Sequence, residues 1–127
     1  MVLTVSLPAF NAGLTSDTFT CKAVNDGSAA AAQILIGFAP RYILVANLTD
    51  GIRDEYFPDN TAGTSWHTIA NGTVTVAAAN GITVLPAGTA NAAAVATGSP
   101  LGALAAGFVL GTGVLLASKT YDIMAVR

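Results

Sequence analysis

The sequence has very few charged side chains. Its 127 residues include five Lys or Arg and seven Asp or Glu, and residues 60–118 contain none of these four types. The basic residues stand singly along the chain: Lys22, Arg41, Arg53, Lys119 and Arg127. A formal net charge of −2 without a basic patch argues against binding to nucleic acid or to an anionic membrane.

The sequence also has only one cysteine and one histidine. Cys21 has no second cysteine to pair with, so assembly in a reducing compartment is expected, and its alternating neighbours predict the buried face of a strand. A zinc site needs at least three Cys, His or carboxylate ligands, which Cys21 and His67 do not supply by themselves. Asp50, Asp54 and Asp59 lack the oxygen spacing of a calcium loop. The sequence therefore predicts no metal and no cofactor.

Catalytic patterns are missing as well. Ser65 and Thr68 lie near His67, but hydroxyl residues are frequent in this chain, so their nearness does not indicate a triad. Asp54 and Glu55 are adjacent, and on a strand they face opposite sides, which does not suit an acid–base pair acting on one substrate. No glycine-rich phosphate loop with its Lys and Ser or Thr is present. We therefore predict that the protein is not an enzyme.

Helical and membrane signals are weak. No stretch of about twelve residues has the spacing of an amphipathic helix. The N-terminal stretch MVLTVSLPAFNAG has no basic residue, so it is not expected to be a signal peptide. The strongest candidate for a membrane span, residues 101–117, contains four glycines. This predicts buried strands broken by glycine turns, with a transmembrane helix as the alternative.

Short runs of β-branched and aromatic residues dominate the rest of the chain, with turn residues between them. Asn71-Gly72 and Asn80-Gly81 stand between alternating runs and predict tight hairpins. The pattern predicts one all-β domain over residues 1–127, a sandwich, jelly roll or small barrel with short strands. Residues 87–103 are small and aperiodic, which predicts an extended loop or arm that orders against a neighbouring subunit.

Half of the charged residues lie in residues 41–59, RYILVANLTDGIRDEYFPD. The part IRDEYF carries charge on both faces of a strand, which predicts an edge strand or a loop at the rim of the sheet. Aromatic side chains mixed with charge at a rim are typical of protein–protein contacts. We therefore predict an interface made by five consecutive residues: Arg53, Asp54, Glu55, Tyr56 and Phe57. Trp66 is expected in the core, and the low charge elsewhere predicts a closed homo-oligomer.

Four stretches, RYILVANLTDGIRDEYF, WHTIANGTVTV, NGITVLP and GFVLGTGVLLASKTYDIMAV, together resemble small β-rich virion proteins of tailed bacteriophages. The resemblance covers residues 41–127 and implies a capsid decoration (cement) protein. Such a protein binds the major capsid protein on the outer surface of the virion, stabilises the shell and self-associates, often as a homotrimer. Assembly in the host cytoplasm is implied too. No catalytic, cofactor or metal residue is carried over.

Three other functions remain open. A tail, neck or fibre component of the same virion would carry the same strand pattern. A carbohydrate- or ligand-binding β module would need an exposed aromatic platform, for which one Trp and three Tyr offer little material. A membrane-associated protein would depend on residues 101–117 as its span.

Overall fold

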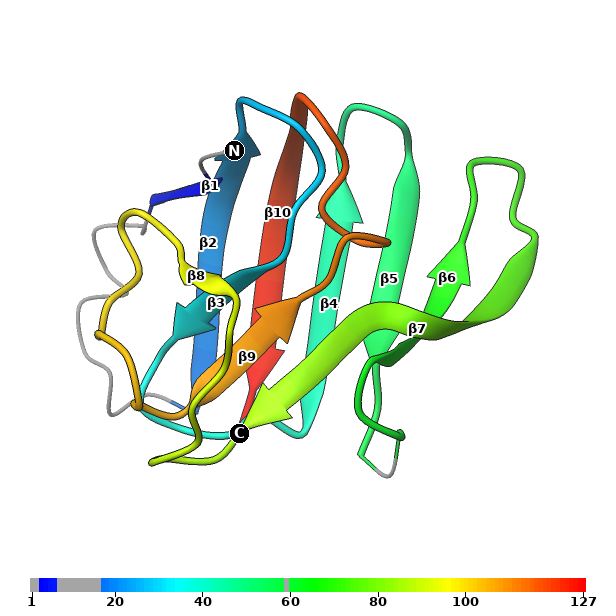
Figure 1. The fold of residues 1–127 in the computed structure, drawn as a ribbon. Helices are drawn as coiled ribbons and strands as arrows, with labels where there is room; N and C mark the ends of the chain where they lie inside the picture. Colours follow the sequence, from blue (N-terminus) through cyan, green and yellow to red (C-terminus); the bar gives the residue numbers. More distant parts are fainter. Residues whose placement is uncertain (1–2, 7–16, 59) are drawn as a thin grey trace.

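The computed structural model describes residues 3–6, 17–58 and 60–127, and these form ten β-strands and no helix (Figure 1). The strands are β1 (Leu3–Ser6), β2 (Thr18–Asn25), β3 (Ala32–Leu35), β4 (Tyr42–Asn47), β5 (Ile52–Tyr56), β6 (Thr64–Thr68), β7 (Val74–Leu85), β8 (Ala94–Val95), β9 (Gly107–Leu110) and β10 (Lys119–Val126). The predicted all-β class is confirmed. No helix in the described ranges is long and apolar enough to cross a bilayer. Asp59 and most of the N-terminal stretch MVLTVSLPAFNAG lie outside the described residues.

All ten strands belong to one sheet, which curls strongly into a half-barrel (Figure 1). The strand order is β1-β2-β10-β4-β5-β6-β7-β9-β3-β8. The two ends of this order meet, because Val5 N donates to Thr97 O at 2.8 Å and Thr97 N donates to Leu3 O at 2.9 Å. Gly98 follows with a φ of +85°, and a Cβ at this residue would overlap the Val5 carbonyl. The chain just after β8 therefore closes the sheet against β1.

The core lies between the two layers that the curled sheet brings face to face. Strands β2 and β10 alternate between buried and more exposed residues, as expected for strands with one face on a core. Strands β3 and β9 are buried at every position. Fully buried large side chains come from both layers: Phe19, Ile43, Tyr121, Ile34, Phe108 and Leu110.

The buried positions predicted for Cys21 and within residues 101–117 are found in the structure. Cys21 lies on the inner face of β2, where burial, with Asp122 nearby, raises the pKa of its thiol to about 12. The thiol therefore stays protonated and poorly nucleophilic. Within residues 101–117 the chain forms the buried strand β9 followed by a turn, because glycine favours turns over a helix interior.

Asn71-Gly72 forms the turn of the β6–β7 hairpin, as predicted. Ile69 N donates to Thr73 O at 3.0 Å, and Gly72 N donates to Ile69 O at 2.9 Å. Gly72 has a φ of +90°, so this is a three-residue loop with glycine in the left-handed conformation. The Asn-Gly signal therefore located this hairpin correctly.

The hairpin predicted at Asn80-Gly81 is wrong, because β7 continues through both residues. Asn80 does take the left-handed conformation, with a φ of 60°, but the chain makes a bulge there instead of reversing. Backbone hydrogen bonds hold this junction from both sides. Gly81 N donates to Gly63 O at 2.8 Å, and Gly111 N donates to Gly81 O at 2.8 Å. At this point β7 leaves β6 and crosses to β9 in the opposite layer (Figure 1).

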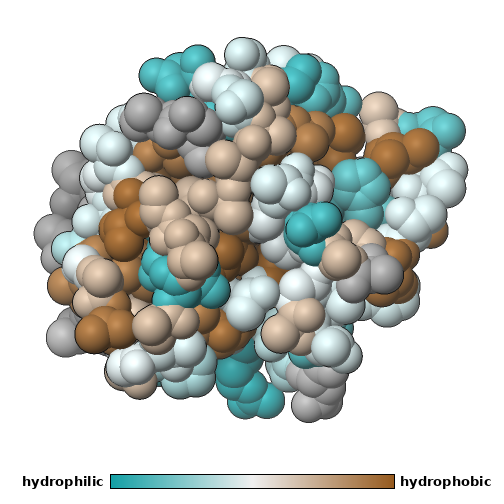
Figure 2. All heavy atoms as spheres, viewed as in Figure 1, coloured by the Kyte–Doolittle hydropathy of each residue, from teal (hydrophilic) through white to brown (hydrophobic). Residues whose placement is uncertain are grey.

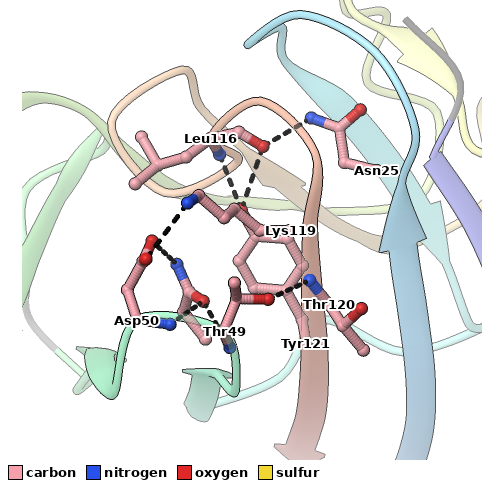
Figure 3. A network of polar contacts seen from close by, with 8 residues as sticks. Asn25, Thr49, Asp50, Leu116, Lys119, Thr120 and Tyr121 are labelled. Carbon is pink, nitrogen blue, oxygen red and sulfur yellow. Dashed lines mark hydrogen bonds and ion pairs between the residues drawn. The ribbon is translucent and has the colours of Figure 1, made fainter.

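A polar network fastens the turn between β4 and β5 to the start of β10 (Figure 3). Lys119 Nζ donates to Asp50 Oδ1 at 3.0 Å. Tyr121 Oη accepts from Leu116 N at 2.6 Å, and Asn25 Nδ2 donates to Leu116 O at 2.8 Å. Asp50 and Lys119, two of the few charged residues, therefore hold strand ends together.

Residues 87–103 lie against the sheet of their own chain. Strand β8 pairs in parallel with β3. Gln33 Nε2 donates to Ala93 O at 2.5 Å, and Leu101 N donates to Leu35 O at 3.1 Å. The remainder of the segment is mostly loop, and β3 supplies partners for its backbone groups. Ordering of this segment against a neighbouring subunit stays a prediction.

Candidate interaction surface

The five predicted interface residues are divided between two faces of the sheet. The predicted edge position of IRDEYF is wrong. Strand β5 pairs with β4 on one side and with β6 on the other. Alternation along a strand puts Arg53, Glu55 and Phe57 on the outer face, and Asp54 and Tyr56 on the inner face. A continuous rim of five residues therefore does not form.

On the inner face, Asp54 is only 3% exposed. Strand pairing places it opposite His67, and its Oδ1 lies 2.7 Å from His67 Nδ1. Ser65 Oγ donates to the same oxygen at 3.4 Å. Tyr56 is half-buried and packs against the main core. The prediction that Asp54 faces water or a partner is therefore wrong, because a charged strand can bury one carboxylate when polar side chains surround it.

The environment of Asp54 acts in two directions on its ionisation. Burial raises the pKa of this carboxyl, and the contacts with His67 and Ser65 lower it by a smaller amount. The Ser65 hydroxyl is directed at the carboxylate, whereas a nucleophile–base pair requires the hydroxyl to face the imidazole. Asp54, Ser65 and His67 therefore satisfy one another's hydrogen-bonding groups on the inner face of the sheet. In the described ranges, no group of three or more His, Cys, Asp or Glu is placed to hold a metal ion.

On the outer face, three aromatic rings follow one another across β4, β5 and β6. The ring centroids of Tyr42 and Phe57 are 5.4 Å apart, and those of Phe57 and Trp66 are 6.4 Å apart in an edge-to-face arrangement. Trp66 is 42% exposed. Its predicted core position is wrong, because the core-facing side of β6 is the one that carries Ser65 and His67.

Charged side chains lie beside these rings. Arg53 Nε is 3.2 Å from Glu55 Oε1, and Tyr42 Oη donates to Glu55 Oε2 at 2.7 Å. Burial and the hydrogen bond to Glu55 raise the pKa of Tyr42 to about 12, so its hydroxyl remains a donor. We call the set Tyr42, Arg53, Glu55, Phe57 and Trp66 the outer aromatic face.

Two shallow hollows lie on either side of the Phe57–Trp66 ring pair. One, of about 670 Å³, is lined by Arg41, Phe57, Pro58, Asn60 and Trp66. The other, of about 440 Å³, is lined by Arg53, Glu55, Phe57, Trp66, Thr68 and Val74. Both can accept side chains of a binding partner, with the rings as the wall between them.

Sequence reasoning missed Tyr42 and Trp66, the two aromatic residues outside the predicted interface. Their strands come next to β5 only through the pairing of β4 with β5 and of β5 with β6. The period-two pattern does place Tyr42 on the same side of β4 as Leu44 and Ala46, but it does not say which side is covered. Strand pairing, more than residue type, assembles this surface.

Comparison of the chain with protein-family models, with curated protein sequences and with solved structures finds no match.

Proposed function

We propose that this chain is a non-enzymatic structural subunit that binds another protein through its outer aromatic face. The observation that carries the proposal is the exposed Phe57–Trp66 ring pair beside the Arg53–Glu55 ion pair. Aromatic residues and Arg supply most of the binding energy in protein interfaces. Together with the resemblance to virion proteins, this supports a capsid decoration (cement) protein that binds the major capsid protein and stabilises the shell.

The construction of the face suits a docking role. Its side chains stand on hydrogen-bonded strands in the middle of the sheet, so little conformational entropy remains to be lost on binding. The two hollows offer sites for anchoring side chains from the partner. The neighbouring charges are exposed to different degrees, and charges at an interface rim affect recognition and association rate more than affinity. The self-association expected from the low charge, as a homotrimer by resemblance, belongs to the same proposal.

The test is binding of the purified chain to heads of the phage that encodes it, after the protein has been removed from them. Trp66→Ala and Phe57→Ala should each weaken co-sedimentation by at least about tenfold. Leu48→Ala is the matched control, because Leu48 is as exposed but lies at the other end of β5. Arg53→Glu should weaken binding more at low salt than at high salt. No binding by the wild type, or equal binding by all variants, overturns the proposal.

A tail, neck or fibre position would use the same kind of contact. An electron density map of the intact particle distinguishes these positions from the head directly. Finding the chain away from the head surface would reject the cement assignment and keep the structural role.

A carbohydrate-binding module is a second candidate, because Trp66 is exposed and stands between two hollows that also contain polar groups. Pockets of this kind combine an apolar wall with a few polar side chains that fix the orientation of a ligand. Binding of the chain to an array of glycans, lost in Trp66→Ala and absent for heads, would favour this function.

A further inference from the structure

Strand β7 has a half that is paired on one side only. Its first residues pair with β6, from Val74 opposite Thr68 to Ala77 opposite Ser65. Its last residues pair with β9, beginning at Ile82. Among the described residues, no strand pairs with the other edge of the first half. This half lies in the hairpin that projects from the half-barrel (Figure 1).

The direction of the backbone groups on this half follows from the hairpin turn. Ile69 N donates to Thr73 O, which makes these two residues a hydrogen-bonded pair. Such pairs recur at every second position in an antiparallel ladder, so Thr75 and Ala77 direct their N–H and C=O groups to β6. Val74 and Val76 therefore direct theirs to the open edge.

The side chains on this edge do not protect it. Natural proteins cover open edges or place Lys, Pro or inward-pointing charges on them. Residues 73–79, TVTVAAA, contain none of these. Val74 is 50% exposed and Val76 is 56% exposed, and both stand on the same face of the sheet as Trp66. Apolar surface is visible on the projecting lobe at the right of Figure 2. An open, uncharged edge of β-branched residues favours the addition of another strand.

We propose that this edge pairs with the same edge of a second copy of the chain, antiparallel and around a two-fold axis at Thr75. The sequence around Thr75 reads the same in both directions, Val74-Thr75-Val76. The axis therefore sets Val74 of each copy against Val76 of the other, and Thr75 against its own counterpart. β-branched pairs and Thr–Thr pairs are favourable cross-strand neighbours.

The backbone groups fit the same register. Val74 and Val76 direct their donors and acceptors outward, so the two Val–Val pairs exchange about four hydrogen bonds, and Thr75 becomes the pair without hydrogen bonds between them. The absence of charge in residues 60–118 means that two copies meet without like-charge repulsion along this edge. The paired hairpins would make one continuous sheet with an outer aromatic face at each end.

This contact joins two chains in the absence of phage heads, so the homotrimer that the resemblance implies would need a different surface and would assemble on the capsid. The edge is short and buries less than the roughly 1,000 Å² that a stable interface requires, so the dimer should dissociate on dilution. The inference does not depend on the proposed function, because it concerns the chain alone.

The experiment measures the mass of the purified chain, without phage heads, by sedimentation equilibrium from about 1 µM to about 1 mM. The wild type should rise from the mass of one chain to that of two. Val76→Lys should keep the mass of one chain, because it brings two like charges to the edge. Val24→Lys is the matched control, since Val24 is 42% exposed on a strand that is paired on both sides, and it should dimerise like the wild type.

Disulfide formation tests the register. In the proposed dimer the two Thr75 Cα atoms are about 4.5 Å apart, which is within the range for a disulfide. Thr75→Cys should therefore give a cross-linked dimer under mild oxidation, and the buried Cys21 does not compete. Thr73→Cys should not, because Thr73 lies opposite Ala77 of the other copy. A wild type of one-chain mass throughout, an assembly unaffected by Val76→Lys, or equal cross-linking of both cysteine variants overturns the proposal.

Discussion

The two halves of β7 have nearly the same sequence pattern and opposite surroundings. The first half, Val74-Thr75-Val76, has both valines at least half exposed. The second half begins Ile82-Thr83 and carries a fully buried Ile82. Only the second half has strands on both sides, β6 at Ile82 and β9 along its length, and only it faces the opposite layer. Burial in this protein is therefore decided by the partner strand that the Asn80-Gly81 junction brings into place, and not by the apolar pattern itself.

The largest expected difference between the halves is in the cost of cutting a side chain back to Ala. Ile82→Ala should lower the free energy of unfolding by about 2–5 kcal/mol, because it leaves a cavity in the core. Val76→Ala should lower it by no more than about 0.5 kcal/mol, since the valine side chain is exposed. Chemical denaturation at a concentration where the chain is monomeric measures both. Equal losses would mean that the hairpin is buried in solution, which contradicts the division of β7 into two environments.

Two neighbouring residues of β5 differ in the same way, because Asp54 lies on the buried inner face and Arg53 on the exposed outer face. Asp54→Ala should cost about 2–3 kcal/mol, because His67 and Ser65 lose a buried partner. Arg53→Ala should cost less than about 1 kcal/mol, since its ion pair with Glu55 is at the surface. Thermal unfolding of the two variants at neutral pH gives the comparison. A loss of stability in Arg53→Ala as large as that in Asp54→Ala would mean that the outer face of β5 is buried as well.

The fold class could be predicted from the sequence, because period-two alternation and turn residues are local signals. The turn at Asn71-Gly72 could be predicted for the same reason. Asn80-Gly81 has the same Asn-Gly sequence but forms a bulge instead of a hairpin turn. A residue with positive φ is compatible with both structures. What distinguishes the two is the approach of Gly63 and Gly111, which lie far along the chain on either side.

The candidate site could be predicted only in part. Arg53, Glu55 and Phe57 are on the outer face, as alternation along one strand allows. The position of Asp54 contradicts the idea of a single charged rim, and alternation itself could have shown this. The contact of Asp54 with His67 and the exposure of Trp66 depend on the register of β5 with β6, which single-strand patterns do not contain.

The junction between the halves of β7 should be sensitive to an added methyl group. A Cβ on Gly81 would lie 2.7 Å from Gly63 O, so Gly81→Ala should cost about 1–3 kcal/mol through displacement of backbone. Gly102→Ala is the control: nothing lies within 4 Å of its Cβ position and its φ is not in the left-handed region, so stability should be nearly unchanged. Denaturant midpoints measure both. An unchanged Gly81→Ala would show that the junction adjusts without loss.

The smallest expected effect is a dependence of stability on pH that comes from Asp54 on the inner face of β5. Burial raises the folded-state pKa of Asp54 above its ordinary value of 3.8, so the folded chain binds this proton more tightly than the unfolded chain does. The stabilisation from protonated Asp54 is therefore complete below about pH 3.8 and is lost as pH rises through the folded-state pKa. Asp54→Asn removes the titrating group and keeps its size. The wild type should be most stable relative to Asp54→Asn at the acid end, and this difference should decline as the pH rises above about 3.8 in denaturant titrations. A difference that grows with pH would mean that the bonds from His67 and Ser65 outweigh burial, and that Asp54 is held as a carboxylate.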